Sequence, residues 1–295
     1  MALPLVQELI FGLVLGSFIA LGAIGFTLVY GLVNMINFAH GEFVTVGAYV
    51  GLIAAQFLGL PFAVAVVAAL AVTAVFGWGV AQVTFEPLND AGAVPLLLTS
   101  IGVGLILRNG IRLAAGASPQ YIDTTRPTAY RFEELGFFFT DQQVFIVAIT
   151  VVAVVALHLF LNRTMIGVAM RATSDNEDLA LVTGIDTRRV RHVVWLIASA
   201  FAGVAGILLA VSRSANPSLG FGQLLLVLTA AILGGAGSPY GAVVGSYILG
   251  IGISLAIAFL PTGVSEFGTT MAFVVLIVVL LVRPGGIVNQ EVRHS

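Results

Sequence analysis

The sequence of 295 residues contains no lysine and no cysteine, and only 9% of its residues are charged. Without cysteine the chain can form no disulfide, thiol nucleophile or lipidated cysteine. A P-loop ATPase needs a lysine on the nucleotide phosphates, and the motif G-x-x-x-x-G-K-[ST] is missing. We therefore expect no cofactor in this chain. If ATP drives its activity, a separate subunit must bind the nucleotide.

The scarcity of charge leaves a strongly apolar chain, with 59% hydrophobic residues and a mean hydropathy of +1.09. A soluble domain of this length needs more polar surface than that. We therefore expect an integral membrane protein, with residues 1–295 forming one transmembrane domain. The first residues lack a basic region, which predicts a retained first helix rather than a cleaved signal peptide.

Apolar stretches of about 20 residues predict membrane-spanning helices. They lie near residues 9–32, 42–59, 62–85, 94–115, 143–161, 192–212, 221–235, 239–260 and 266–282. The predicted fold class is therefore all-α, a polytopic bundle of about eight or nine spans. The stretch 221–235 is short for a full crossing, so the count depends on whether one helix is broken or re-entrant.

Two polar stretches predict the orientation in the membrane. Residues 162–191 hold five arginines, Arg163, Arg171, Arg188, Arg189 and Arg191, so we expect this loop in the cytoplasm. Four predicted spans lead from it to the tail, which places the C-terminus on the same side. Counting back over five spans puts the N-terminus and the loop 117–142 outside.

Glycine is abundant, with 34 residues, and several of them are spaced by four positions. The rows are Gly12-x-x-x-Gly16, Gly47-x-x-x-Gly51 and Gly237-x-x-x-Gly241-x-x-x-Gly245. Such rows let helix backbones approach closely in lipid. We interpret them as packing contacts of a compact bundle.

Two apolar segments, 30–42 and 232–241, contain Gly or Asn where a helix can break, one in each half of the chain. Paired interruptions of this kind are typical of the midplane binding site of transporters. The alternative is two tight turns at the membrane face. The residues that we predict to border a pathway are Asn34, Asn37, His40, Gly41, Glu42, Gly234, Gly235 and Gly237.

Few ionisable residues fall within the predicted spans, and charges there are costly enough to be functional candidates. Arg108 and Glu266 lie near span ends and are predicted to be interfacial anchors. The spans carry no row of acids or histidines of the kind that relays protons in ion-coupled carriers. Neither H-E-x-x-H nor G-x-S-x-G is present, so we expect neither a metal site nor a hydrolase.

The loop 162–191 predicts a short helix outside the membrane. Ser174 or Asp175 suits the N-cap, Glu177 and Asp178 suit the first turn, and Gly184 suits the end. A capped helix of two to three turns favours a docking element over a solvated connector. The predicted coupling residues are Arg171, Ser174, Asp175, Glu177, Asp178, Ala180, Gly184 and Asp186.

Four stretches, in order, resemble a known family. They are GLVNMINFAHGEFVTVGAYVG at 31–51, RATSDNEDLALVTGID at 171–186, AILGGAGSPYGAVVG at 231–245 and RPGGI at 283–287. Together they are similar to the branched-chain amino acid ABC permeases of the LivH type. The second stretch resembles the cytoplasmic coupling loop of these permeases.

The resemblance implies an importer in a prokaryotic plasma membrane. A LivM-type second permease, two ATP-binding subunits and an extracytoplasmic binding protein are the implied partners. The helix near 174–183 is then expected to enter a groove on an ATP-binding subunit, and the loop 117–142 to face the binding protein. Because related permeases handle urea or short amides, an ABC permease for these solutes is an alternative. The readings from other classes are a stand-alone ion-coupled carrier and a scaffold without transport activity.

Overall fold

The computed structural model describes residues 2–122, 127–132 and 136–259, with isolated residues between 270 and 281. The helices are Ala2–Val33 (α1), His40–Leu52 (α2), Phe62–Thr84 (α3), Ala93–Ala115 (α4), Asp141–Arg163 (α5), Met165–Asp175 (α6), Glu177–Val182 (α7), Thr187–Ser212 (α8), Leu219–Gly234 (α9) and Pro239–Phe259 (α10). A π-helical turn, Ile53–Phe57, extends α2, and a 3-10 turn, Glu86–Ala91, follows α3.

The multi-pass helical class is confirmed. Within the described residues, α1, α3, α4, α5, α8 and α10 are long and apolar enough to cross a membrane. The predicted spans near 42–59 and 221–235 coincide with the shorter helices α2 and α9. The predicted span 266–282 and the tail motif lie outside the continuously described residues.

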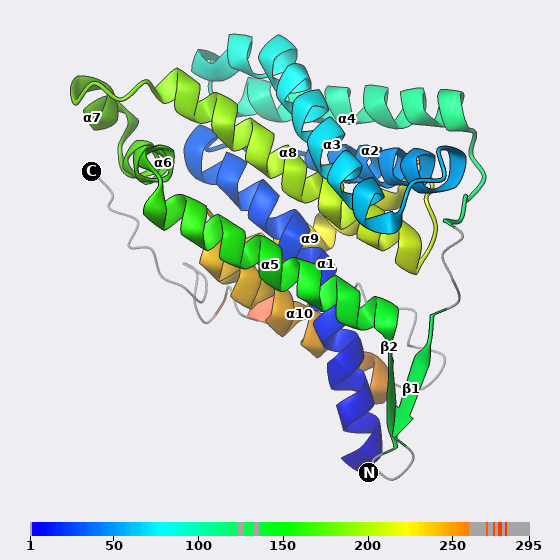
Figure 1. Cartoon of the computed structure of the whole chain (residues 1–295). Helices are drawn as coiled ribbons and strands as arrows, with labels where there is room; N and C mark the ends of the chain where they lie inside the picture. The colour runs from blue at the N-terminus through cyan, green and yellow to red at the C-terminus, as the bar shows by residue number, and fades with distance from the viewer. Residues whose placement is uncertain are drawn as a thin grey trace.

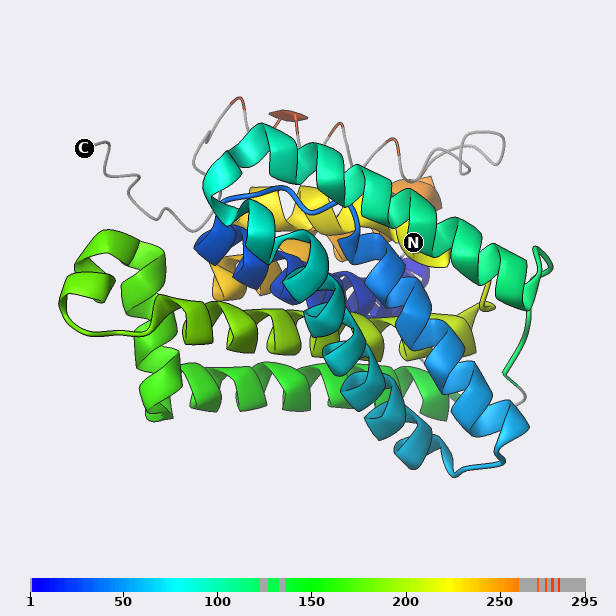
Figure 2. The same cartoon turned by 90° about the horizontal axis from the view of Figure 1, so that it is seen from above.

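Helices α1 and α8 form the centre of the bundle (Figures 1 and 2). In the most apolar 18-residue stretch of each helix, 72% is buried in α8 but only 17% in α4. The peripheral helices α3, α4 and α5 therefore present apolar side chains outward, among them Val83, Ile106 and Val152. Such a surface is stable against hydrocarbon or against another apolar helix. These helices therefore need no polar face.

The glycine rows lie at helix contacts, as predicted. A Cβ on Gly12 would meet the backbone of Ile251 in α10, and one on Gly51 would meet the side chain of Ile207 in α8. In the third row, Gly241 and Gly245 face the backbone of α9. Small residues are needed at these positions because the facing helix leaves no room for a side chain.

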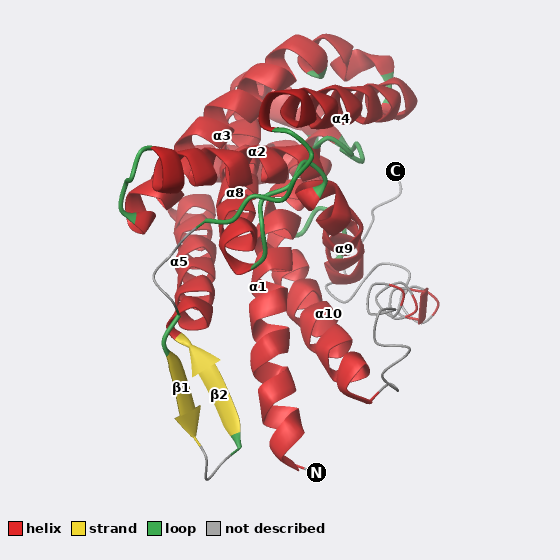
Figure 3. Cartoon of the chain, turned by 90° about the vertical axis from the view of Figure 1, so that its right-hand side faces the viewer, coloured by secondary structure: helices red, strands yellow, loops and turns green. Residues whose placement is uncertain are grey.

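The loop 117–142 contains a feature that the sequence reading missed, an antiparallel hairpin of Ala129–Phe132 (β1) and Phe137–Thr140 (β2). The N–H of Phe138 donates to Gln7 Oε1 at 2.9 Å, and the rings of Phe138 and Phe11 make an edge contact. The hairpin therefore lies beside the start of α1 (Figure 3). Helices α6 and α7 lie at the opposite end of the bundle (Figure 1).

The first interruption is a break at depth, not a tight turn. Helix α1 ends where Asn34 adopts φ +51° and its N–H bonds to the Tyr30 carbonyl, a left-handed cap. The chain then turns back into the bundle, and His40 Nε2 lies 2.9 Å from the Gly22 carbonyl oxygen. Gly22 is 11 residues before the end of α1, about 16 Å along the helix axis. Helix α2 therefore begins inside the bundle.

The second interruption is a tight turn. Gly235 and Gly237 have φ values of +108° and +92°, and the N–H of Ser238 donates to the Gly235 carbonyl at 3.0 Å. These left-handed conformations suit glycine because it has no Cβ. The turn joins α9 to α10 at the end of the bundle where α1 also finishes.

Replacing Gly47 of α2 by valine should lower stability, because a Cβ there would overlap the backbone of Gly203 in α8. Overpacking of this kind costs about 1–3 kcal/mol. Thermal unfolding of the purified protein in detergent measures the loss. Gly79→Val is the matched control, since nothing lies within 4 Å of a Cβ on Gly79. Equal melting of both variants would contradict the close approach of α2 and α8.

Candidate functional site

Helix α7 is capped at both ends by side-chain and backbone groups. The Asn176 side chain accepts a hydrogen bond from the N–H of Leu179 at 2.9 Å. At the other end the N–H groups of Gly184 and Ile185 bond to the carbonyls of Leu181 and Ala180, a Schellman motif. Gly184 has φ +86°, so its predicted role as the helix end is confirmed.

The predicted N-cap was wrong, because Ser174 and Asp175 belong to the last turn of a preceding helix. That helix, α6, begins at the cap Thr164, whose hydroxyl accepts from the N–H of Gly167 at 3.0 Å. Its buried residues Met170 and Thr173 recur at helical spacing, which is the sequence signal that would have found it. The predicted single helix is therefore a pair, α6 and the shorter α7.

Arg191 of α8 holds α7 against the bundle. Its guanidinium bonds to Glu177 in the first turn of α7 and, at 3.1 Å, to Glu86 after α3. The Arg191 side chain is only 12% exposed, so these ion pairs are screened less than surface pairs. The sequence reading missed this cluster, because Glu86 is distant in the chain.

The outer side of α7 is apolar and exposed. Leu179, Leu181 and Val182 are 61%, 52% and 86% exposed, whereas Ala180 between them is buried. Asp178 is exposed beside them. A six-residue helix that is capped at both ends and anchored by Arg191 thus presents three apolar side chains away from the bundle. Such a protrusion fits a hydrophobic groove on a partner.

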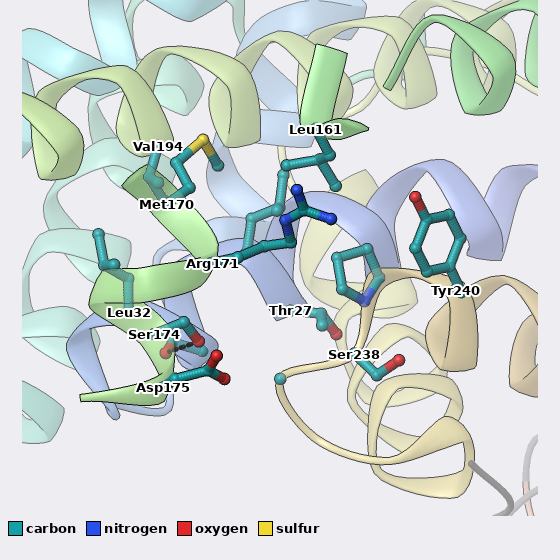
Figure 4. A pocket seen from close by; sticks show the side chains of 14 residues that line it. Thr27, Leu32, Leu161, Met170, Arg171, Ser174, Asp175, Val194, Ser238 and Tyr240 are labelled. Carbon is teal, nitrogen blue, oxygen red and sulfur yellow. Dashed lines mark hydrogen bonds between the residues drawn. The ribbon is translucent and has the colours of Figure 1, made fainter. Parts of the chain in front are cut away.

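Helix α6 links α7 to the end of α1. The Ser174 hydroxyl donates to the Gly31 carbonyl at 2.7 Å (Figure 4). This carbonyl is one of the last four of α1, which have no partner within their own helix. A Cβ on Gly31 would also lie 3.2 Å from the Gly237 carbonyl oxygen. The three stretches singled out in the sequence therefore meet at Gly31.

A cavity of about 180 Å³ lies at this junction, lined from α1, α6 and the α9–α10 turn (Figure 4). On its wall, Arg171 Nη1 donates to Asn162 Oδ1 at 2.8 Å. Asn162 also donates to the Tyr240 hydroxyl, which lies 3.0 Å from His158 Nδ1. Asp175 lines the same cavity. A displacement of α6 would therefore be felt by α1, α5 and α10 together.

The other predicted residues are placed as follows. Asp186 caps α8 by accepting from the N–H of Arg189 at 3.0 Å. Gly237 lines the cavity, and Asn34 is exposed at the end of α1. Gly234 packs against Gly241, and Gly235 forms the turn beside it. Asp186 follows the end of α7, and Gly237 lines the same cavity as Ser174 of α6.

Asn37, His40, Gly41 and Glu42 lie in the interior instead. Glu42 is fully buried, and its Oε1 accepts from Arg108 Nε at 2.9 Å and Nη2 at 2.6 Å. Arg108 is therefore a partner of a buried acid, a role that the interfacial-anchor prediction missed. Gly41 packs on the backbone of Gly220 where α9 begins. A pathway role for these residues stays a prediction.

The long apolar helices define a multi-pass helical membrane protein, with the short helices α6 and α7 together at one end. PsaBC from Streptococcus pneumoniae, solved in complex with a Fab, has a similar fold, with a TM-score of 0.50 at 14% identity over 95% of this chain and 91% of that one. The chain belongs to the family of branched-chain amino acid transport system permease components, whose model matches residues 8–282.

Individual relatives agree with this family. The chain is 35% identical to the high-affinity branched-chain amino acid transport system permease protein LivH of Escherichia coli, covering 96% of this chain and 95% of LivH. It is 25% identical to the corresponding protein LivM of the same organism, covering 92% of this chain and 67% of LivM. The resemblance stated from the sequence motifs is thereby confirmed.

Replacing Arg191 by glutamine should loosen α7, because Glu177 then loses its charged partner and Glu86 keeps only the longer pair with Arg188, at 3.9 Å. A hydrogen bond to a charged group contributes about 1.5–3 kcal/mol, so amide exchange in residues 177–184 should accelerate roughly tenfold or more. Hydrogen exchange followed by mass spectrometry measures this. The control is Arg189→Gln, whose exposed side chain has no ion-pair partner among the described residues. Unchanged exchange in Arg191→Gln would rule out the anchoring role.

Proposed function

We propose that this chain is the transmembrane permease subunit of an ATP-driven importer for branched-chain or related amino acids. The family and the similarity to LivH over nearly the whole chain support the transport class. The observation that carries the ATP-driven part is the exposed apolar tip of α7, connected through α6 to the end of α1. The chain itself performs no hydrolysis in this proposal, and ATP is bound by partner subunits.

In the proposed mechanism, movement is transmitted through the hydrogen bonds at the ends of helices. ATP-binding subunits close on ATP and displace α7 and α6 together. The Ser174 hydroxyl then pulls on the Gly31 carbonyl, and the Arg171–Asn162–Tyr240 contacts act on α5 and α10. Since α1 is central, its tilt shifts the bundle between inward-open and outward-open states.

The proposed partners follow from this geometry. Two ATP-binding subunits meet the end that carries α6 and α7, so residues 162–191 face the cytoplasm and the N-terminus lies outside. A binding protein delivers the solute at the hairpin end, near residues 117–142. The second permease is of the LivM type, and the similarity of this chain to both LivH and LivM supports a pair of related subunits.

The pathway is proposed to pass the interrupted segment before α2. Asn37 and His40 are buried in the single chain, so an opening requires the helices around them to separate. Asn34 and Gly237 then lie at the inner exit, beside the cavity at Gly31. A stand-alone ion-coupled carrier is less well supported, because the family is one of transport-system permease components and Glu42 is already paired with Arg108.

ATP-dependent uptake tests the proposal directly. The chain is co-purified with its companion subunits, which are identified by mass spectrometry, and reconstituted in vesicles with the binding protein. We expect leucine to accumulate only with ATP on the side of the ATP-binding subunits. Accumulation driven by an ion gradient without ATP would overturn the proposal. Uptake of urea or acetamide instead of leucine would change the substrate class but not the mechanism.

Replacing Val182 by aspartate tests the docking surface. Val182 is 86% exposed, so the variant should fold normally, but a charge at the tip should oppose insertion into an apolar groove. We expect co-purification of the ATP-binding subunits to fall by about tenfold or more, since burying an unpaired charge costs at least 1.4 kcal/mol. Val182→Leu keeps the apolar surface and should bind normally. Wild-type recovery with Val182→Asp would exclude α7 as the docking element.

A further inference from the structure

A second cavity, of about 340 Å³, lies at the C-terminal end of α4, and neither α6 nor α7 lines it. It is lined by the outer part of α4 and by the segment that precedes α9. Its polar lining residues are Arg108, Asn109, Arg112, Asn216 and Ser218. No carboxylate is among the described residues that line it. Cavities of this size are typical of small-molecule sites.

The two arginines stand at different depths. Arg108 is 15 residues from the start of α4, about 22 Å along its axis, and Arg112 is about 6 Å further out. The Arg108 side chain is 21% exposed and lies with its guanidinium carbon 3.8 Å from the centre of the Phe221 ring. Its Nε and Nη2 donate to Glu42 Oε1, and Nη1 has no hydrogen-bond partner among the described residues. The position of this donor is therefore set by an ion pair and a ring.

Arg112, by contrast, has no ion-pair partner among the described residues. With Arg108 neutralised by Glu42, the cavity keeps one uncompensated positive charge. The N-terminus of α9 begins at Ser218 on the cavity wall, and a helix N-terminus adds partial positive charge. Guanidinium groups match the geometry of a carboxylate. The cavity is thus suited to one small anion-bearing group.

We propose that this cavity is an entry subsite that holds the carboxylate of an α-amino acid between Arg108 and Arg112. This inference rests on the proposed function and specifies which chemical group of the substrate is recognised. The amide oxygen of Asn109 is an acceptor available to the ammonium group. Asn216 Oδ1 already accepts from the N–H of Ser218 at 3.1 Å and offers its second lone pair. Because Arg108 is recessed, a free amino acid reaches it more easily than a carboxylate on the surface of a binding protein.

Thiol protection tests the subsite, because the native chain has no cysteine. Ser218→Cys places a single thiol on the cavity wall and leaves both arginines in place; Ser218 makes no side-chain cap bond. The complete complex without binding protein is treated with an uncharged maleimide in the presence of leucine or leucinol. Leucinol keeps the side chain and the ammonium group but has no carboxylate. Labelling of this chain alone is followed by mass spectrometry.

We expect leucine at about twice its Kd to slow labelling roughly threefold, since the occupied fraction is shielded, and leucinol to have no effect. Adding Arg112→Gln to Ser218→Cys should remove the protection. Ala129→Cys, an exposed position on the hairpin outside the cavity, should label equally in all conditions. Ala117→Cys, at another lining position with no assigned role, repeats the measurement if Ser218→Cys does not assemble.

Equal protection by leucinol, or no protection by leucine, would overturn the carboxylate subsite. Protection by the amino-acid-free binding protein but not by leucine would assign the arginines to protein docking and would also overturn it. ATP-driven leucine uptake by the wild-type complex separates this failure from a failure of the proposed function. If uptake is intact and protection is absent, only the subsite is wrong.

Discussion

A backbone group at membrane depth must find a partner within the protein, because lipid offers none. In this chain the difficult places are the ends of helices that begin or finish inside the bundle. The N–H of Gly220, at the start of α9, donates to the Thr45 hydroxyl of α2, and the N–H of Phe38 donates to Ser100 of α4. Hydroxyl groups from neighbouring helices thus replace the water that would cap these ends in a soluble protein.

The same constraint connects α6 to the bundle. The Gly31 carbonyl at the end of α1 is satisfied by Ser174 of α6, so the bond that completes α1 also connects it to the helix pair α6 and α7. The buried acid Glu42 also needs a partner within the protein, and Arg108 provides it. Removal of either partner would leave a buried charge uncompensated. In the proposed mechanism, the contacts that satisfy these buried groups also transmit movement between helices.

Local patterns predicted the helical stretches, an interruption within segment 30–42 and the end of α7, because hydropathy and the conformational preferences of glycine and asparagine are properties of short segments. The start of α7 was misplaced because Ser174, Asp175 and Asn176 are all good N-caps, and α6 was not predicted. The hairpin was missed because two four-residue strands carry little pattern of their own and are held in part by contacts with α1.

The sequence alone determined the membrane class, the family resemblance and the absence of a nucleotide lysine, since composition and motif order are read without coordinates. Only the tertiary structure paired Glu42 with Arg108, and Arg191 with Glu86. It also brought Gly31, Ser174 and Gly237 to one point and formed the arginine cavity beside α9. The Glu42–Arg108, Glu86–Arg191 and Gly31–Ser174 contacts join residues 66, 105 and 143 positions apart, and no local periodicity specifies which distant helices lie side by side.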